Sequence, residues 1–401
     1  VRQVSRGKLP RATDLMLTPA NARRVAEKLS ELRGAAMKVG QLLSMDNGEI
    51  LPAELASMLS VLRADARPMP MSEVVTVMQE SVGHGWEHRF KRFSFTPMAA
   101  ASIGQVHAAI TQGERQLALK IQYPGIVESI DSDVDNVATL LNLSRLLPDG
   151  LDLQPLLQEA KRQLHEEADY RLEARHLQHF ALALEDRPEF LLPGVDESLT
   201  RENILAMDLL EGEPIESLTT APQETRDRVV GLLLELLFRE MFEFGMIQTD
   251  PNLANFLYIP GTRQLGLLDF GATRRYPARI IGAYRQLLES ALREDHDAMS
   301  ESAQQIGYFK SEIHPHQRAA VMELFVLATE PARTRGRYNF GTSDLAVRIR
   351  DAGMALSFSQ GYWHTPPADA VFLHRKLGGL YLLAARLRAR VEVHAILDRY
   401  L

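Results

Sequence analysis

The chain has 401 residues, of which 45% are hydrophobic and 24% are charged, so it can form two folded lobes and lacks the composition of a disordered protein. Its formal net charge of −7 argues against general binding to nucleic acid. It contains no cysteine, which excludes disulfide scaffolds, cysteine-ligated zinc or iron–sulfur sites, and thiol catalysis.

The sequence shows no apolar stretch of about 20 residues, the length needed to cross a bilayer. Its longest segment without Asp, Glu, Lys or Arg covers residues 93–113, and it is rich in small and polar residues. No apolar signal-peptide region follows the basic N-terminal residues Arg2, Arg6, Lys8 and Arg11. These residues could contact anionic lipid or form a solvated tail, and the sequence leaves both open.

The first 90 residues are predicted to be an α-helical extension. Thr18-Pro19 is typical of a helix start, and apolar residues then recur at three- and four-residue steps from Val25 to Leu43. A second helix is expected to begin at Pro52, and a third covers Met71–Val82.

From about Phe93 the pattern becomes mixed, and after about residue 210 it is mostly helical. We expect domains over residues 1–90, 91–210 and 211–401. Short strands are predicted at 93–95, 117–121, 203–207, 256–258 and 265–268. Helices are predicted at 129–147, 153–184, 223–244, 277–293, 296–306, 314–328 and 368–388.

The sharpest chemical signal is Asp250-Pro-Asn-Leu-Ala-Asn255, followed by Asp269-Phe-Gly271. This order and spacing match the catalytic and metal-binding loops of kinase folds. Nucleotide phosphates need Mg²⁺, which prefers hard oxygen ligands, and Asn255 and Asp269 supply them. Asp250 can accept a proton or orient the nucleophile. The alternative is a pair of solvated turns.

Lys120, in Ala-Leu-Lys-Ile, has the pattern of the strand lysine that pairs with the α- and β-phosphates in kinases. It needs a carboxylate partner, and one helical segment offers four. Helical periodicity places three of them on one face and Glu167 about 100° away from Glu166, so it does not choose among them. The candidates are Glu166, Glu167, Asp169 and Glu173.

No glycine-rich phosphate loop is present. The corresponding segment runs from Ala99 through Ala100, Ala101 and Ser102 to Gly104. Small side chains still let backbone N–H groups approach phosphate oxygens, although alanine resists positive φ and a tightly packed turn is the alternative. In the first long helix Lys38 and Gln41 face the same way, which is also compatible with an ordinary surface.

Together these motifs resemble the UbiB/ADCK atypical kinases, in particular the coenzyme Q (ubiquinone) branch. The resemblance covers residues 19–400, nearly the whole chain. Its motifs are Lys38–Gln41, Ala99–His107, Leu119–Gly125, Glu167–Ala174, Gln248–Phe256, Leu268–Arg274 and His374–Gly379.

The resemblance implies an α+β, atypical protein-kinase-like fold of two lobes with an N-terminal helical extension that carries the KxGQ motif. In such a fold Lys38 enters the active site with Gln41 near it, and both would be regulatory. Glu167 would pair with Lys120, and Glu173 would be a second acidic position contacting the extension. Met207 and Leu209, at the end of the strand over 203–207, complete the residues assigned to the nucleotide.

The implied cofactors are ATP or ADP and Mg²⁺, and the implied activity is an atypical kinase or ATPase that supports ubiquinone biosynthesis. Phosphorylation of proteins in trans is not expected, because a helix follows Asp269 almost at once and leaves little room for a peptide-docking segment. A catalytically weak nucleotide-binding scaffold, which organises lipid or biosynthetic enzymes, is the alternative.

Expected partners are nucleotide, anionic membrane lipids, and ubiquinone-biosynthesis enzymes or quinone precursors. The expected location is the cytoplasm, or the mitochondrial matrix in a eukaryote, peripheral to the inner membrane. The motifs do not bear on oligomeric state, and a symmetric homodimer is compatible with them.

Overall fold

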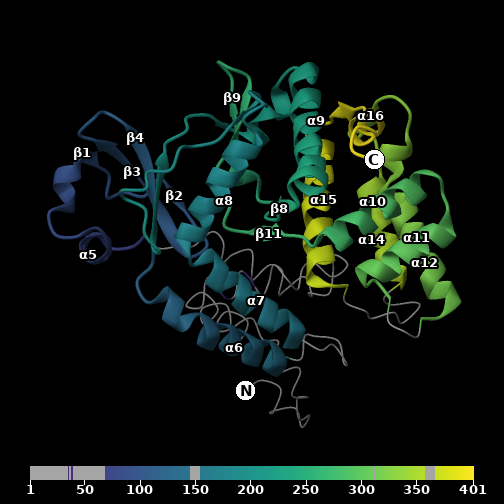
Figure 1. Cartoon of the computed structure of the whole chain (residues 1–401), viewed down its shortest axis with the longest axis horizontal. Coiled ribbons are helices and arrows are strands. Elements are labelled where there is room, and N and C mark those ends of the chain that lie inside the picture. Colours follow the sequence, from purple (N-terminus) through teal and green to yellow (C-terminus); the bar gives the residue numbers. More distant parts are fainter. Residues whose placement is uncertain (1–34, 36–37, 39–67, 145–153, 310–312, 357–365) are drawn as a thin grey trace, which may run out of the picture. The chain divides into compact units, whose positions relative to one another are not determined.

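The computed structural model describes residues 35, 38, 68–144, 154–309, 313–356 and 366–401 (Figure 1). The chain forms two compact units. The first unit consists of Val1–Arg171 and Asp196–Met207, and the second of Leu172–Val195 and Asp208–Leu401. The mixed α+β architecture expected from the sequence is confirmed. The helix predicted from Pro19 onward lies outside the described residues, except for two helical positions at Ala35 and Lys38.

The first unit is built on a five-stranded sheet in the order β1-β3-β4-β6, with β2 paired to β3. The strands β3 and β4 form a long antiparallel hairpin in which Val106 faces Lys120. The strand bounds are β1 Phe90–Phe93, β2 Ala99–Ala100, β3 Gly104–Thr111, β4 Gln116–Gln122 and β6 Ile204–Asp208. The helices are α5 Met71–Val82, α6 Ile126–Ser144 and α7 Gln154–Glu167, with a 3₁₀ turn over Trp86–Arg89.

An aromatic cluster fills one end of this unit's core. Trp86 is 2% exposed, and its ring contacts those of Phe90, Phe93 and Phe95 edge-on. His107, on β3, stacks on Phe93 with ring centroids 5.7 Å apart. These contacts join the segment after α5 to strands β1 and β3 of the sheet.

The second unit contains a four-stranded sheet in the order β5-β10-β9-β7 and a two-stranded ladder of β8 with β11. The bounds are β5 Phe190–Leu191, β7 Glu213–Pro214, β8 Met246–Gln248, β9 Phe256–Ile259, β10 Gln264–Leu267 and β11 Thr273–Arg275. A further ladder joins β12 Tyr338–Asn339 to β13 Arg390–Val391.

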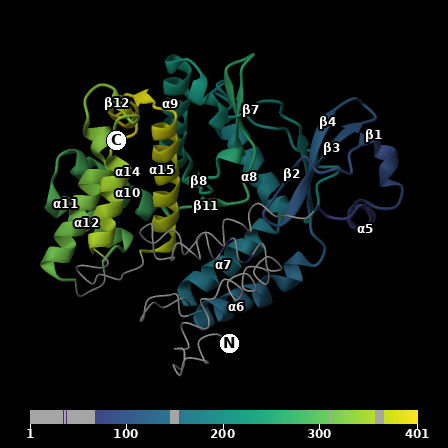
Figure 2. The same ribbon diagram turned by 180° about the vertical axis from the view of Figure 1, so that it is seen from behind.

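Helices make up most of the second unit. Figures 1 and 2 both show α9 and α15 running side by side, and the two helices are in contact. The helix bounds are α8 Tyr170–Ala183, α9 Gln223–Arg239, α10 Ala278–Leu292, α11 His296–Ile306, α12 Pro315–Ala328, α13 Glu330–Arg333, α14 Leu345–Met354, α15 Ala368–Arg386 and α16 Val393–Leu397. A π-helical turn, Glu240–Phe244, follows α9, and 3₁₀ turns cover Ile215–Thr220 and Leu253–Asn255.

The helix predicted over residues 153–184 is wrong in one respect, because the structure has two helices there. Its α7 ends at Glu167 and α8 begins at Tyr170. The reason is local: the Asp169 carboxylate accepts the backbone N–H of Arg171 at 3.0 Å, so the side chain caps a new helix start instead of continuing the old one.

The other predictions agree with the structure to different degrees. The helices over 71–82 and 296–306 are confirmed, and Asp295 caps the second by accepting the N–H of Ala298. The strand predicted at 93–95 lies instead at β1, and the prediction missed β3 because its alternation includes small alanines. The helix over 223–244 is α-helical only to Arg239 and π-helical after it.

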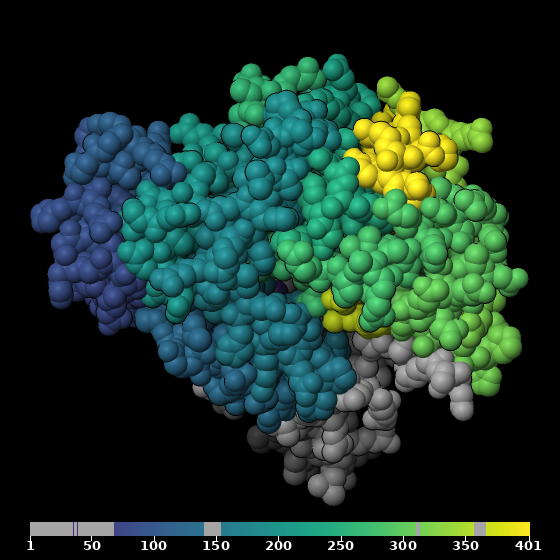
Figure 3. All heavy atoms as spheres, viewed as in Figure 1, coloured from purple at the N-terminus to yellow at the C-terminus, as the bar shows by residue number. Residues whose placement is uncertain are grey.

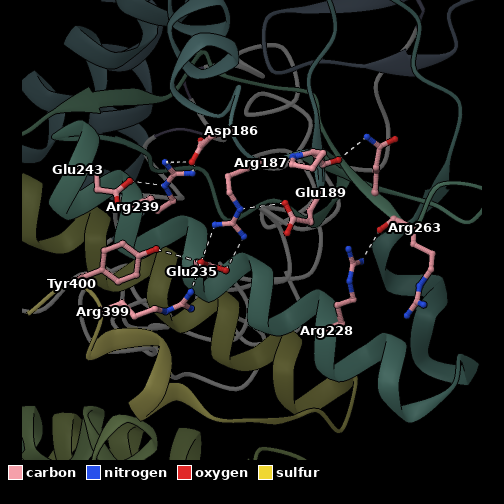
Figure 4. A network of polar contacts seen from close by, with 12 residues as sticks. Asp186, Arg187, Glu189, Arg228, Glu235, Arg239, Glu243, Arg263, Arg399 and Tyr400 are labelled. Atoms are coloured by element: carbon pink, nitrogen blue, oxygen red, sulfur yellow. Dashed lines mark hydrogen bonds and ion pairs between the residues drawn. The ribbon is translucent and has the colours of Figure 1, made fainter.

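An ion-pair network anchors α9 to the rest of its unit (Figure 4). Glu235 accepts two hydrogen bonds from Arg187, at 2.8 and 3.0 Å, and one from Arg399 at 2.9 Å. Arg239 pairs with Asp186 at 3.1 Å. Figure 3 shows the C-terminal segment that supplies Arg399 at the surface of this unit. The network fixes the helix that leads into the loop at Asp250.

Candidate active site

Lys120 lies on β4, in the middle of the first unit's sheet, and is 7% exposed. Its ammonium lies 5.2 Å from the centre of the fully buried ring of Tyr170, a cation–π arrangement. Both flanking residues, Leu119 and Ile121, are fully buried. The strand therefore holds the Lys120 ammonium in a largely desolvated position.

The hairpin that includes Ala99 and Ala100 on β2 turns back into β3 at Gly104. Ala101 donates its N–H to the Gly104 carbonyl at 2.9 Å, which closes a tight turn. A Cβ on Gly104 would lie 2.2 Å from the Ile121 carbonyl oxygen, so only glycine fits this close approach of strands. Ala99, Ala100 and Ser102 are exposed.

Glu167 ends α7 and contacts Lys38, which belongs to the N-terminal extension. Its carboxylate pairs with the Lys38 ammonium, and the two side chains are 12% and 8% exposed. Its other oxygen lies 3.4 Å from the Ser102 hydroxyl of the small-residue hairpin. The KxGQ lysine, the hairpin and Glu167 are therefore brought together in the first unit. Gln41 lies outside the described residues.

The other three carboxylate candidates differ in environment. Glu166 pairs with Arg162 on an exposed face, and Asp169 caps α8. Glu173 is 2% exposed and lies in the second unit, where its carboxylate accepts the backbone N–H of Phe270 at 3.4 Å. Helical periodicity could not separate these residues because the helix it assumed is broken between them.

In the second unit, the loop after β8 places Asp250 against Asn255. The Asn255 amide donates to the Asp250 carboxylate at 2.9 Å, and the other carboxylate oxygen accepts the backbone N–H of Asn252 at 3.3 Å. Asn252 in turn accepts the N–H of Ala254 and so caps the following 3₁₀ turn. With its NH₂ group engaged in this way, Asn255 has its carbonyl oxygen left to offer a cation.

Asp269-Phe270-Gly271 follows β10 and is held by α8. The Asp269 carboxylate accepts the Gly271 N–H at 3.0 Å, and Phe270 is 2% exposed with its ring 4.8 Å from that of Phe180. His176, also on α8, contacts the Phe270 carbonyl at 3.3 Å, and burial lowers the pKa of this imidazole despite that hydrogen bond. The aspartate therefore sits in a turn packed against a helix.

Backbone bonds tie the two loops of the second unit together. Leu268 donates its N–H to the Asn255 carbonyl at 3.0 Å, and Thr249 donates to the Ala272 carbonyl. The structure thus brings Asp250, Asn255 and the segment at Asp269 together. Across the described residues, no cluster of three or more His, Asp or Glu side chains could hold a metal alone. Asn255 and Asp269 carry oxygen donors of the kind that Mg²⁺ prefers, an amide carbonyl and a carboxylate.

The predicted site residues divide between the two units. Those on β2, β3, β4 and α7 belong to the first, as does Met207, which is 7% exposed near the end of β6. Leu209, Glu173, Asp250, Asn255 and Asp269 belong to the second unit, and Leu209 is half-buried.

Sequence reasoning gave no role to the end of the chain, where α15 contacts the Asp250 loop. An Arg375 nitrogen lies 3.6 Å from an Asp250 carboxylate oxygen. A Cβ on Gly379 would lie 2.7 Å from Pro251, so the helix approaches the loop closely there. The motif His374–Gly379 was visible in the sequence, but its partner lies more than a hundred residues upstream and no periodicity connects them.

Comparison with known proteins settles the family. The model of the ABC1 atypical kinase-like domain matches residues 61–303. The chain belongs to the ABC1 family of atypical kinases. The kinase-like fold and the atypical kinase class are thereby confirmed. The resemblance to the coenzyme Q branch of the UbiB/ADCK kinases is confirmed by relatives named COQ8.

Relatives on the COQ8 branch match nearly the whole chain. Atypical kinase COQ8, mitochondrial, from Saccharomyces cerevisiae is 38% identical over 392 residues, which cover 98% of this chain and 78% of the yeast protein. Atypical kinase COQ8B, mitochondrial, from Rattus norvegicus is 36% identical over 94% of this chain and 71% of its own length.

A solved structure has a similar fold. The Rv3197–erythromycin complex from Mycobacterium tuberculosis aligns with a TM-score of 0.64 and 27% identity, covering all of this chain and 98% of that one. Among the described residues, this chain has no helix that is long and apolar enough to span a membrane.

Proposed function

We propose that this ABC1 kinase is a Mg²⁺-dependent ATPase or small-molecule phosphotransferase that supports ubiquinone biosynthesis. The observation that carries the proposal is the hydrogen bond from Asn255 to Asp250, next to the Asp269 turn. In a kinase-like fold this pairing leaves a carboxylate for the nucleophile and an amide oxygen for the cation. ATP with Mg²⁺, when bound, supplies an activated phosphoryl group whose charge the cation partly neutralises.

The residues of this chain then have separate roles. Asp250 orients the attacking hydroxyl or water and takes up its proton, and Asn255 and Asp269 hold the cation. Lys120 binds phosphate oxygens from β4. The hairpin from Ala99 to Gly104 presents backbone N–H groups to the same phosphates.

Water or a small molecule fits the site better as acceptor than a protein does. Only eight residues separate Asp269 from the start of α10 at Ala278, and three of them form β11, which pairs with β8. Because it pairs with β8, this segment is not available to bind a peptide. A peptide substrate would lack the extended docking segment that conventional protein kinases use.

Membrane attachment and location are part of the same proposal. We infer that the protein acts at the periphery of a membrane that holds ubiquinone precursors, with anionic lipids and biosynthetic enzymes as partners. The mitochondrial names of COQ8 relatives support a mitochondrial matrix location in a eukaryote. The basic residues at the N-terminus lie outside the described residues. Flotation with anionic liposomes of chains starting at Val1 and at Asp14 measures their role.

A nucleotide-binding scaffold with negligible chemistry is the second candidate. The Lys38–Glu167 pair favours it, because a carboxylate already occupied by the extension is not available to Lys120. Under this alternative nucleotide raises the melting temperature, and no Asp250-dependent hydrolysis accompanies it.

The deciding experiment is ATP turnover with Mg²⁺, with and without anionic liposomes and phenolic quinone precursors. We expect turnover that Asp250→Asn and Asp269→Asn each reduce by on the order of 100-fold or more. Asp351→Asn, at an exposed position of α14, is the matched control and should match the wild type. Hydrolysis that is equal in all four proteins would overturn the proposal.

A further inference from the structure

Lys376 and Glu240 form a buried ion pair in the second unit. Lys376, on α15, is 4% exposed, and Glu240, in the π-helical turn after α9, is 1% exposed. Burial lowers the pKa of the Lys376 ammonium and raises that of the Glu240 carboxyl, so desolvation opposes the charged form of both. Such a pair adds little stability compared with well-packed apolar residues, and its presence therefore calls for another role.

The pair lies next to the end of β8, the strand that leads to Asp250. Besides Lys376, the Glu240 carboxylate accepts the backbone N–H of Gln248, the last residue of β8 and two residues before Asp250. The Gln248 side chain is 4% exposed, and its amide has no hydrogen-bond partner among the described residues. The strand end is thus anchored through its main chain, by Glu240 and by the ladder with β11.

The helix that carries Lys376 also contacts the loop beyond the strand. Arg375 reaches the Asp250 carboxylate at 3.6 Å, and Gly379 allows the close approach to Pro251. One helix face therefore contacts the strand end through Glu240, the carboxylate of the loop and its proline. Loss of any of these three contacts is therefore expected to shift Asp250 relative to Asn255.

We propose that Lys376 and Glu240 are positioning residues, which fix the end of β8 on α15 and thereby set the orientation of Asp250. The inference rests on the proposed function, because it concerns the turnover to which Asp250 contributes. Neither residue touches the reacting atoms. Their effect passes through the main chain of Gln248.

A charge-free replacement separates positioning from folding. In Lys376→Met/Glu240→Leu both charges are removed together, so no unpaired buried ion remains and the fold should be retained. We expect a melting temperature near or above that of the wild type. We also expect kcat to fall on the order of 10- to 100-fold, with KM for ATP changed less than about threefold, because misplacement affects the chemical step.

A second double variant tests the contact with Gln248. Lys376→Met/Glu240→Gln has nearly the same shape but keeps an oxygen that can accept the Gln248 N–H. If Glu240 positions β8 through that contact, the Met/Gln variant should recover at least about half of the lost kcat, measured on a logarithmic scale. A merely structural pair predicts equal turnover in the two double variants.

The matched control is Arg386→Gln/Glu216→Gln, which removes an exposed ion pair of the same helix and should leave turnover unchanged. If the Met/Leu chain does not fold, Glu240→Asp takes its place, because it keeps the charge but withdraws the carboxylate from Gln248. Wild-type kcat per folded molecule in that variant overturns the inference, as does wild-type kcat in a folded Met/Leu chain.

Asp250→Asn, measured alongside, distinguishes a failure of positioning from a failure of the proposed function. If it abolishes turnover while Lys376→Met/Glu240→Leu does not, the inference about positioning fails and the proposed function stands. If the wild type shows no Asp250-dependent turnover, the proposed function fails and the inference falls with it.

Discussion

Asn255 donates a hydrogen bond from its side-chain amide to the carboxylate of Asp250 at 2.9 Å, across five residues of one loop. The bond determines which end of each side chain faces outward. It engages one oxygen of Asp250 and the NH₂ group of Asn255, and under the proposed function it leaves Asp250 to orient a nucleophile and the Asn255 amide oxygen to bind a cation. The same hydrogen bond therefore shapes the loop and orients the two side chains of the candidate site.

Replacing Asn255 should weaken the use of Mg²⁺ before it affects stability. In Asn255→Ala we expect turnover to fall on the order of 100-fold, because one oxygen ligand and the restraint on Asp250 are both lost. The Mg²⁺ concentration for half-maximal activity should rise. A Mg²⁺ titration of ATP hydrolysis measures this, and an unchanged midpoint would argue against a role for Asn255 in holding the cation.

Arg375 should contribute to turnover through its charge. Its ion pair with Asp250 involves side chains that are 18% and 25% exposed, so solvent screens it only in part. We expect Arg375→Gln to lower kcat about tenfold and Arg375→Lys to recover much of the loss. Arg386→Gln, on the exposed face of the same helix, is the comparison, and equal activity of the two glutamine variants would contradict the prediction.

Gly104 should not tolerate even a methyl group. A Cβ there would lie 2.2 Å from the Ile121 carbonyl oxygen, which belongs to backbone and cannot swing away. We expect Gly104→Ala to lower the free energy of unfolding by about 2–3 kcal/mol. At Gly113, where the nearest atom is 3.9 Å away, the same change should stay within about 0.5 kcal/mol. Urea titration of both variants provides the comparison.

Lys38 and Glu167 should be energetically coupled. Because both side chains are largely buried, removing one leaves the other charge without its partner. A double-mutant cycle of Lys38→Ala and Glu167→Ala should give a coupling of about 0.5–3 kcal/mol in the free energy of unfolding. Strict additivity of the two single variants would mean that the extension does not dock on Glu167 in solution.

Stability should fall as the pH drops below about 6.5, the ordinary pKa of a histidine side chain in water. Burial lowers the pKa of His107 in the folded chain, with a smaller opposing contribution from its hydrogen bond to the Ser94 carbonyl. The unfolded chain therefore binds the proton first, and the stability present above pH of about 6.5 is lost on acidification at up to about 1.4 kcal/mol per pH unit.

Chemical denaturation at a pH of about 7.5 and of about 5.5, on either side of that pKa, measures the effect of His107. In His107→Gln the difference between the two pH values should be smaller than in the wild type. Some dependence should remain, because burial also lowers the pKa of His176. A variant with the full wild-type pH dependence would exclude His107 as a source.

The sequence by itself determined the family, the kinase-like fold class and the motifs of the candidate site. The loop from Asp250 to Asn255 and the turn at Asp269 are local patterns, and hydrogen bonds between residues close in sequence form both of them. Spacing along the chain carries such information, because a side chain five residues away can be reached within one turn. The boundaries of the helices over 71–82 and 296–306 were predictable for the same reason.

Only the tertiary structure decided which distant residues meet. Helical periodicity could not choose among the four carboxylates considered as partners of Lys120, because the helix ends before Asp169 and Glu173 lies on the next one. Nor could it show that Glu167 pairs with Lys38. Nor could it reveal that Lys376 pairs with Glu240, 136 residues earlier. Buried ion pairs depend on desolvation and on packing between distant elements, and a local sequence pattern does not report either of these.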